Sequence, residues 1–245
     1  MTGMRAADAL AFDPLRFARK LNLGCGFDRR EGFLNVDLHA FHQPDLVCDV
    51  LELAPLPSGH YEHVLAQDVL EHLPRLKTRA ALMEWNRVLA VGGTLELRVP
   101  DVNGLARLLE LPENQSPARQ EELLQNLFGT QAYPGDFHYI GFTEPFLRAL
   151  LEECGFAIEH LAREEGWLFH VVALKLRDVR RNPLLAIADD AEFVRAAYRD
   201  LLGREADPGG FDYHLRLLAE GASRESILER FTSSEEYRAR HGVRT

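Results

Sequence analysis

Five short apolar segments follow one another between residues 19 and 99, and their spacing constrains the fold more than any other feature. They are residues 20–23, 33–36, 46–48, 63–66 and 94–99. Each has the length of a buried strand, and apolar positions at i, i+3 and i+7 predict a helix over residues 76–89. Strands that alternate with helical segments indicate an α/β fold built on a mostly parallel sheet.

The connections between the first three strands are short. Residues 24–32 join the first pair and residues 38–45 join the second pair. A parallel crossover that contains a full helix takes about a dozen residues or more, so these two can hold at most one helical turn each. Part of one sheet face should then lack its usual helices. We expect the N-terminal segment 6–19, the C-terminal helices or a second chain to cover it.

The rest of the chain divides into two parts. Helices are predicted over 104–111 and 117–128, a loop over 129–141, and a helix that Thr143 caps with Pro145 in its first turn. Consecutive strands over 157–161 and 168–176 are typical of an antiparallel edge pair. After the boundary segment 178–183, every segment is predicted to be helical, over 191–202, 210–219 and 224–240, with Ser233 and Glu236 as a capping box. We therefore predict a domain over 1–178 and a helical module over 184–245.

The composition argues against several classes of protein. The net charge is −10, from 28 Lys+Arg and 38 Asp+Glu, whereas nucleic-acid binding needs a cationic surface. The N-terminus lacks the apolar core of a signal peptide, and no run approaches the ~18 apolar residues of a membrane span. Cys25, Cys48 and Cys154 form no C-x-x-C pair, which indicates a reducing compartment. We expect a cytoplasmic protein with no membrane span and no nucleic-acid partner.

Gly24, Gly26 and Asp37 stand where a nucleotide cofactor could bind. Glycines let the backbone approach a ligand closely, and an acid at the end of the next strand can accept hydrogen bonds from ribose hydroxyls. On these residues alone, a simple tight turn is an equally good interpretation. A dinucleotide fingerprint would need a third glycine at Arg29 and an acid about 20 residues further on. Neither is present, so a nicotinamide oxidoreductase is disfavoured.

Six motifs together carry a family resemblance. In chain order they are LNLGCG, NVDL, CDVLEL, VLAQDVLEHL, EWNRVLAVGGTLELRVPD and FTEPFLRALLEECGF. This succession resembles class I S-adenosylmethionine-dependent methyltransferases, and above all small bacterial ones associated with glycan synthesis. The resemblance covers residues 19–176. It implies a Rossmann-like sheet of order 3-2-1-4-5-7-6 with the last strand antiparallel, and S-adenosylmethionine as the cofactor.

The resemblance also implies which residues bind the cofactor. They are Asn22, Gly24, Gly26, Asp37, Leu38, Asp49, Val50, Gln67 and Asp68. The two glycines would line the methionine and ribose, and Asp37 would hold the ribose hydroxyls. Asp49 would lie beside the adenine, and Gln67 with Asp68 would close the pocket near the sulfonium. Two positions depart from the family pattern, because Asn22 replaces the usual acid and Asp28 a third glycine.

Three residues are candidates for the chemistry. His138 lies on the long loop, His72 follows the fourth strand, and Asp101 follows the fifth. Each could act as the base for a hydroxyl acceptor, but His138 could equally be a structural loop residue and His72 could brace a helix start. Asp68, Glu71 and His72 would share one helix face. The pattern His39-x-x-His42 with Asp45 could suggest a metal, but we interpret both histidines as solvent-exposed and predict no metal.

The module after residue 184 shows a second resemblance. Residues 193–240 resemble a small helical domain of unknown function and, distantly, the linker domains of phycobilisomes. Nothing in this segment suggests catalysis, so we expect it to pack on the first domain, on a second copy of the chain or on a partner protein. The whole chain is expected to methylate a small molecule or a glycan, most simply a sugar hydroxyl in surface-polysaccharide synthesis. The alternative is a non-catalytic scaffold that retains the cofactor pocket.

Overall fold

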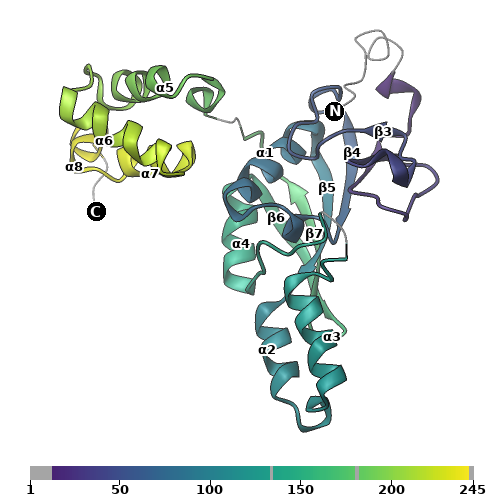
Figure 1. Ribbon diagram of the computed structural model, residues 1–245. Helices are drawn as coiled ribbons and strands as arrows, with labels where there is room; N and C mark the ends of the chain where they lie inside the picture. The colour runs from purple at the N-terminus through teal and green to yellow at the C-terminus, as the bar shows by residue number, and fades with distance from the viewer. Residues whose placement is uncertain (1–12, 133–134, 180–181, 243–245) are drawn as a thin grey trace. The chain divides into compact units, whose positions relative to one another are not determined.

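The computed structural model describes residues 13–132, 135–179 and 182–242. The chain folds as two compact units, divided between residues 179 and 180 (Figure 1). None of the helices in these three ranges is long and apolar enough to cross a membrane.

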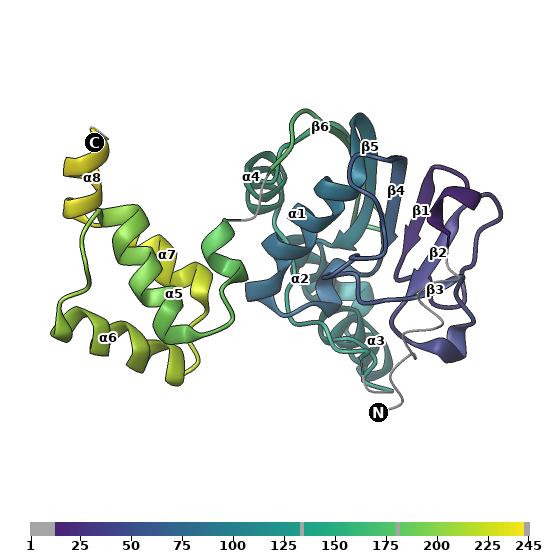
Figure 2. The same ribbon diagram turned by 90° about the horizontal axis from the view of Figure 1, so that it is seen from above.

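A seven-stranded sheet forms the centre of the first unit within the described residues. Its strands are β1 (Lys20–Leu23), β2 (Leu34–Asp37), β3 (Leu46–Val47), β4 (Tyr61–Gln67), β5 (Leu89–Pro100), β6 (Phe156–Glu164) and β7 (Leu168–Lys175). The order is β3-β2-β1-β4-β5-β7-β6, and Figure 2 shows how the strands fan across the sheet. The first five strands pair in parallel, while β7 runs antiparallel to both β5 and β6. The predicted fold class and strand order are confirmed.

Both early crossovers are as short as predicted. Residues 24–33 contain no helix, and only the 3-10 turn η2 (Ala40–His42) lies between β2 and β3. Buried amides stabilise these connections instead. The Asn22 Nδ2 donates to the carbonyl of Asp28 at 2.7 Å and to Oδ1 of Asn35 at 3.0 Å, and Asn35 Nδ2 donates to Asp45 at 2.8 Å. Because these amides are buried, each hydrogen bond fixes the loop against the strand pair.

Helices pack on the apolar side of the sheet. Helices α1 (Thr78–Val88) and α4 (Glu144–Glu153) contribute to one core with β4, β5 and β7. The buried strand residues alternate along each strand and include Val64, Leu95, Leu97, Val99, Phe169 and Val171. Helices α2 (Val102–Glu110) and α3 (Pro117–Phe128) run side by side and project beyond the sheet (Figure 1).

The opposite side of β4, β5 and β7 differs from the expectation of an apolar face in need of cover. It carries the partly buried polar residues His63, Thr94, Glu96, Arg98 and His170. The strand register places the apolar residues Leu65, Val172 and Leu174 on the same face. The polar residues pair with one another, with His63 Nδ1 at 2.8 Å from Thr94 Oγ1 and His170 Nε2 at 3.0 Å from Glu96 Oε1. The described residues thus show a mixed face rather than an apolar one, and the cover expected there stays a prediction.

The N-terminal segment falls only partly within the structure. Residues 6–12 of the expected cover lie outside the described residues. Phe17 packs against the core, whereas Leu15 is 64% exposed.

Two predicted boundaries were wrong. Strand β5 begins at Leu89 rather than at residue 94, so Gly92 and Gly93 lie inside it. The predicted helix 224–240 is broken into α7 (Arg224–Thr232) and α8 (Glu235–His241). Ser234, rather than Ser233, caps α8 by accepting a hydrogen bond from the Tyr237 amide at 3.1 Å.

The second unit is helical and builds its own core. Before α7 and α8 it contains α5 (Asp190–Ala197), a π-helical turn (Tyr198–Leu202) and α6 (Pro208–Ala219). Phe193, Val194, Ile227 and Phe231 are nearly or fully buried within it. The expected packing of this unit on the first domain or on a partner stays a prediction.

Candidate active site

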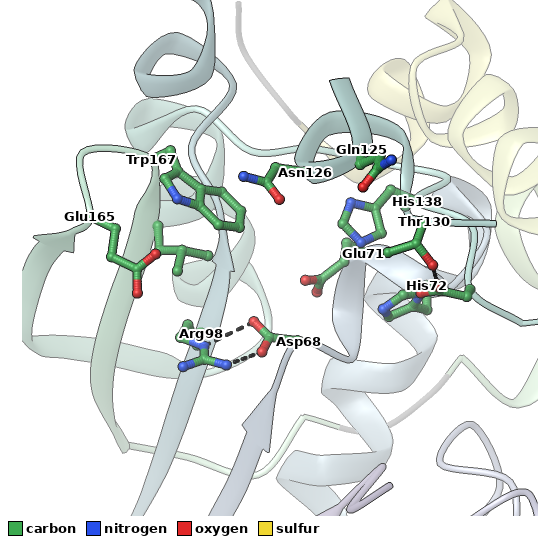
Figure 3. A pocket seen from close by; sticks show the side chains of 13 residues that line it. Asp68, Glu71, His72, Arg98, Gln125, Asn126, Thr130, His138, Glu165 and Trp167 are labelled. Atoms are coloured by element: carbon green, nitrogen blue, oxygen red, sulfur yellow. Dashed lines mark hydrogen bonds and ion pairs between the residues drawn. The ribbon is translucent and has the colours of Figure 1, made fainter. Parts of the chain in front are cut away.

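A pocket of about 300 Å³ lies at the edge of the sheet where β4 and β5 end and β7 begins. Its lining residues are Asp68, Glu71, His72, Arg98, Gln125, Asn126, Gly129, Thr130, Asp136, His138, Glu165, Trp167 and Leu168. Figure 3 shows Glu71, His72 and His138 on one side and Trp167 with Glu165 on the other. Ligands bind at this edge of open parallel sheets, so the pocket is the candidate active site.

The segment after β4 brings two of these side chains into the pocket. Asp68 has a positive φ of 53°, and its carboxylate is held by Arg98, whose Nε lies 2.9 Å from Oδ1. The chain then forms the 3-10 turn η3 (Leu70–His72) rather than an α-helix. The expected i, i+3, i+4 helix face is therefore wrong, yet Glu71 and His72 both line the pocket.

The loop after α3 brings His138 to the same place. The His138 amide donates to the carbonyl of Phe128, the last residue of α3, at 3.1 Å. The next amide, of Tyr139, donates to the carbonyl of Glu71 at 2.8 Å. Because consecutive residues are tied to α3 and to η3, the ring of His138 is held beside that of His72. The ring centroids lie 4.8 Å apart in an edge-to-face arrangement.

The electrostatics of this cluster are unusual. Glu71 is 1% exposed, and burial raises its pKa to about 8, with the charge of Asp68 adding to the effect. Burial also lowers the pKa of His138, and His72 lowers it further. Among the described residues, Glu71 Oε2, His72 Nδ1 and His138 Nδ1 are buried atoms without a hydrogen-bond partner. A buried polar atom left unpaired costs about 1–3 kcal/mol, so three together point to something that the pocket binds.

The rest of the pocket lining is suited to a polar ligand with apolar faces. Trp167 offers a half-buried indole ring. The side-chain amides of Gln125 and Asn126 make no hydrogen bond to any described residue. Thr130 is bonded to the Asp136 carboxylate. An aromatic surface with free amides can stack on a ring and bond its substituents at once.

The glycine loop and Asp37 form a second part of the site. The Gly26 amide donates to Asp37 Oδ2 at 2.9 Å, and Oδ1 accepts from the His39 amide at 2.8 Å and from His42 Nδ1 at 2.9 Å. Burial alone would raise the pKa of Asp37, but the hydrogen bonds from His39, His42 and Gly26 outweigh it and lower that pKa. Asp37 is thus held as a carboxylate at the tip of β2.

Open space borders the glycine loop at Gly26. A Cβ added at Gly26 would meet nothing within 4 Å, so the backbone borders open space there. A Cβ at Gly24 would lie 2.6 Å from Val69 Cγ2. The glycine loop therefore touches the segment between β4 and η3 that lines the pocket, and a ligand on Gly26 and Asp37 can reach toward Asp68.

The remaining expected cofactor residues lie around the same strand ends and differ in their exposure and in their hydrogen-bond partners. Leu38 is 58% exposed beside Asp37, whereas Val50 is buried, and its carbonyl accepts from Trp85 Nε1. Asp49 is exposed and accepts from the Leu51 amide, and Gln67 accepts from Arg30. Asn22 uses both amide hydrogens within the crossover network described above, so its amide group is committed to the loop.

The third catalytic candidate lies elsewhere. Asp101 is fully buried and does not line the pocket. Its Oδ1 caps α2 by accepting from the Asn103 amide at 3.0 Å, and its Oδ2 accepts from Arg163 Nε at 3.0 Å. These contacts give Asp101 a role in the packing of α2 against β6.

The histidines expected to be solvent-exposed also differ. His42 is 8% exposed and bonds Asp37, so the interpretation of two solvent histidines was wrong for His42.

Sequence reasoning left some pocket residues out of the site. Glu71 is the most important, and only its place between Asp68 and His72 could have suggested it, because burial of a glutamate is not visible in a sequence. Trp167 lies in the turn between β6 and β7, far along the chain from the motifs, and carried no signal of its own.

Comparison with known families divides the chain in two. Residues 14–97 match the model described as a methyltransferase domain. Residues 185–241 match the model described as a domain of unknown function, DUF4214. No curated protein matches the chain.

Several solved structures are similar over most of the first unit. One is an S-adenosylmethionine-dependent methyltransferase from Methanosarcina mazei, with 17% identity over 71% of this chain and 99% of that one, at a TM-score of 0.48. A second is the 1,6-didemethyltoxoflavin-N1-methyltransferase of Burkholderia thailandensis with bound S-adenosylhomocysteine, with 18% identity over 71% and 78%, at 0.43. A third is the magnesium protoporphyrin IX methyltransferase of Synechocystis PCC 6803 with bound S-adenosylhomocysteine, with 18% identity over 69% and 79%, at 0.43.

Proposed function

We propose that this chain, a class I S-adenosylmethionine-dependent methyltransferase that carries a DUF4214 domain, methylates a hydroxyl group of a sugar-containing acceptor. The cofactor supplies an electrophilic methyl group on a sulfonium sulfur. Gly24, Gly26 and Asp37 would hold its ribose and methionine, and its methyl would face Asp68 and the pocket beyond. We propose these binding roles on the open space at Gly26 and the carboxylate of Asp37.

The observation that carries the acceptor class is the lining of the pocket. Trp167 offers an aromatic face, while Gln125 and Asn126 offer amides that are free within the described residues. Sugars present apolar C–H faces and several hydroxyls, so a ring beside amides matches both. A cavity of about 300 Å³ has room for one or two sugar rings at most.

We assign the acceptor hydroxyl to the side of the pocket formed by His138 and His72. Both residues line the pocket and have a buried Nδ1 without a hydrogen-bond partner within the described residues, and Glu71 lies beside them. Asp101 is given no part in the chemistry, because its carboxylate is occupied by α2 and Arg163. In-line transfer requires the hydroxyl oxygen, the methyl carbon and the sulfur to be aligned, which this cluster and Asp68 would enforce.

The cellular location of the protein and the role of its C-terminal module are also part of what we propose. We propose a cytoplasmic location, because the three cysteines are free thiols in the described structure. We propose that the module over 184–245 binds a second copy or a partner protein rather than the acceptor, because none of the residues that line the pocket lies in it.

The test uses the full chain with S-adenosylmethionine and matched acceptors, and it measures release of S-adenosylhomocysteine. Free sugars, nucleotide sugars and short glycans are compared with phenols and amines of similar size. We expect turnover with a sugar-containing acceptor only. His138→Gln should lower turnover at least tenfold and leave cofactor affinity unchanged.

His160→Gln, which changes an exposed histidine on β6, serves as the matched control and should behave as wild type. Turnover with phenols or amines alone would overturn the acceptor class. Cofactor binding without turnover on any acceptor would favour the scaffold alternative.

A further inference from the structure

We propose that Glu71, His72 and His138 bind a divalent transition-metal ion, and that this ion holds the acceptor hydroxyl in front of the cofactor. The metal site stands on geometry alone, whereas its role rests on the proposed function. In the described part of the chain, each of the three residues offers one ligand atom, and these atoms all lie within 4.8 Å of one another.

The cluster is polar and buried, and its hydrogen-bonding capacity is not satisfied. One oxygen of Glu71 and one nitrogen of each histidine have no hydrogen-bond partner among the described residues, although each atom is nearly inaccessible to solvent. No ion pair to Glu71 occurs within those residues either, because the nearby Arg98 is paired with Asp68. A cation at the centre of the cluster would satisfy all three atoms and the buried carboxylate together.

The position of the His138 ring is consistent with a ligand role. Its centroid lies 4.8 Å from that of His72, in an edge-to-face arrangement. Its Nδ1 has no hydrogen-bond partner within the described residues, so this nitrogen is available to bind a metal ion.

Backbone hydrogen bonds support the three ligands. Glu71 and His72 are neighbours in η3, and the Glu71 carbonyl is bonded to the amide of Tyr139, next to His138. Ligands at about 2.0–2.2 Å from a metal lie roughly 3–3.5 Å apart, so a separation of 4.8 Å must shrink by about 1.3–1.8 Å when the ion binds. His138 lies on a loop, and small rotations of the imidazoles are enough for that change.

The donor set decides the class of ion. Two imidazoles with one carboxylate suit zinc, manganese, iron or cobalt, whereas magnesium and calcium prefer oxygen ligands alone. Three protein ligands leave positions open for one or two hydroxyls of a sugar. A hydroxyl that binds a divalent cation is more acidic than a free one. It would release its proton to solvent as the oxygen–methyl bond forms and the methyl–sulfur bond breaks, with that electron pair staying on sulfur.

The test measures metal binding directly, on the full chain without a polyhistidine tag and after treatment with a chelator. Titration calorimetry with Mn²⁺, Zn²⁺ and Mg²⁺ gives affinity and stoichiometry, and the visible absorption of Co²⁺ reports its ligands. We expect one site per chain for Mn²⁺, Zn²⁺ and Co²⁺, with Mg²⁺ weaker. Glu71→Gln, His72→Gln and His138→Gln should each lower the affinity at least tenfold, while S-adenosylmethionine binding shows that each variant is folded. His160→Gln should bind as wild type.

Several outcomes would overturn the metal site. The first is that Mn²⁺, Zn²⁺ and Co²⁺ do not bind at millimolar concentration. The second is that they bind, but none of the three substitutions weakens the binding. Full turnover of the metal-free chain, together with loss of turnover in His138→Gln, would refute the role of the metal and leave the proposed function intact. One metal ion per chain that depends on all three residues, with no sugar acceptor found, would support the site and refute the acceptor instead.

Discussion

Asp37 is a buried carboxylate whose charged form three donors stabilise. Its position at the tip of β2 could be predicted, because an acid that ends the second apolar run fits a ribose site. Its partner His42 could not, since a histidine three residues past His39 in a polar loop carries no sign of burial. The structure places His42 at 2.9 Å from Asp37, so the carboxylate is oriented before any ligand arrives.

We expect Asp37→Ala to weaken binding of S-adenosylmethionine strongly. Charge-assisted hydrogen bonds contribute about 1.5–3 kcal/mol, which corresponds to roughly a 10- to 150-fold rise in Kd. Calorimetry on the full chain measures it, with the exposed Asp200→Ala as the matched control. Unchanged affinity in a folded Asp37→Ala chain would remove this residue from the cofactor site.

The lowered pKa of Asp37 also predicts how stability depends on pH. The unfolded chain takes up this proton near the ordinary value of 3.8, and the folded chain only at lower pH. The stabilisation is therefore complete above that value and is lost as the pH falls through the folded pKa. Urea unfolding, followed by the fluorescence of Trp85 and Trp167, should show Asp37→Asn less stable than wild type at pH 6. The gap should narrow toward pH 3, and a gap that does not change with pH would contradict the assignment.

At the scale of elements, the two glycines of the turn after β1 differ in one respect. Both have a positive φ, but only one of them also has a close side-chain neighbour. Gly24 and Gly26 have positive φ angles of 60° and 51°, and an L residue in this region costs about 1–2 kcal/mol. Only Gly24 also lies against Val69, with 2.6 Å between the added Cβ and Cγ2. Gly24→Ala should therefore lower the melting temperature more than Gly26→Ala does.

Gly26→Ala, in turn, should raise the Kd for S-adenosylmethionine, because the added methyl fills the open space beside Asp37. Thermal unfolding and calorimetry on the two variants separate these effects. Equal losses of stability would mean that Val69 moves aside freely. Unchanged affinity in Gly26→Ala would place the cofactor away from this turn.

The elements that sequence predicted best are those with strong local signals. The short crossovers followed from spacing alone, and α3 was predicted with its observed bounds because Ser116, Pro117 and Gly129 mark both ends. The start of β5 was missed, because Gly92 and Gly93 suggest a break in the chain, while the buried Leu89 already pairs with Tyr61 of β4. The break between α7 and α8 was missed because either Ser233 or Ser234 could cap the N-terminus of α8. Only the structure shows that Ser234 does so.

At the scale of the whole molecule, the active site combines segments that no local pattern connects. His72 and His138 were candidates separately, but their contact depends on hydrogen bonds that run from the loop after α3 to η3. Trp167 arrives from the turn between β6 and β7. The expected cofactor residues lie between positions 22 and 68, in motifs that sequence can identify, and their roles stay a prediction. Sequence could not predict the acceptor side, which long-range packing assembles.

The last residues of the first unit are held to its core by hydrogen bonds. Residues 175–179 are tied to α1 and β5. The Lys175 Nζ, fully buried, donates to the carbonyls of Asn86 and Leu89 at 2.7 Å each and pairs with Asp178 at 2.6 Å. The Asn86 side chain in turn bonds the Arg177 carbonyl at 3.0 Å and the Val179 amide at 3.1 Å. The first unit is thus complete only at Val179.

We expect a chain that ends at Val179 to bind S-adenosylmethionine within about twofold of the full-length Kd, because every expected cofactor residue and its hydrogen-bond partners precede that point. A chain that ends at Leu176 should be less stable by about 1–3 kcal/mol, since it loses two Asn86 hydrogen bonds and the ion-pair partner of a buried lysine. Calorimetry and urea unfolding of both truncations measure this. If the chain that ends at Val179 is folded yet fails to bind the cofactor, the DUF4214 unit must contribute to the pocket, and its role would be part of the enzyme's own site rather than recruitment.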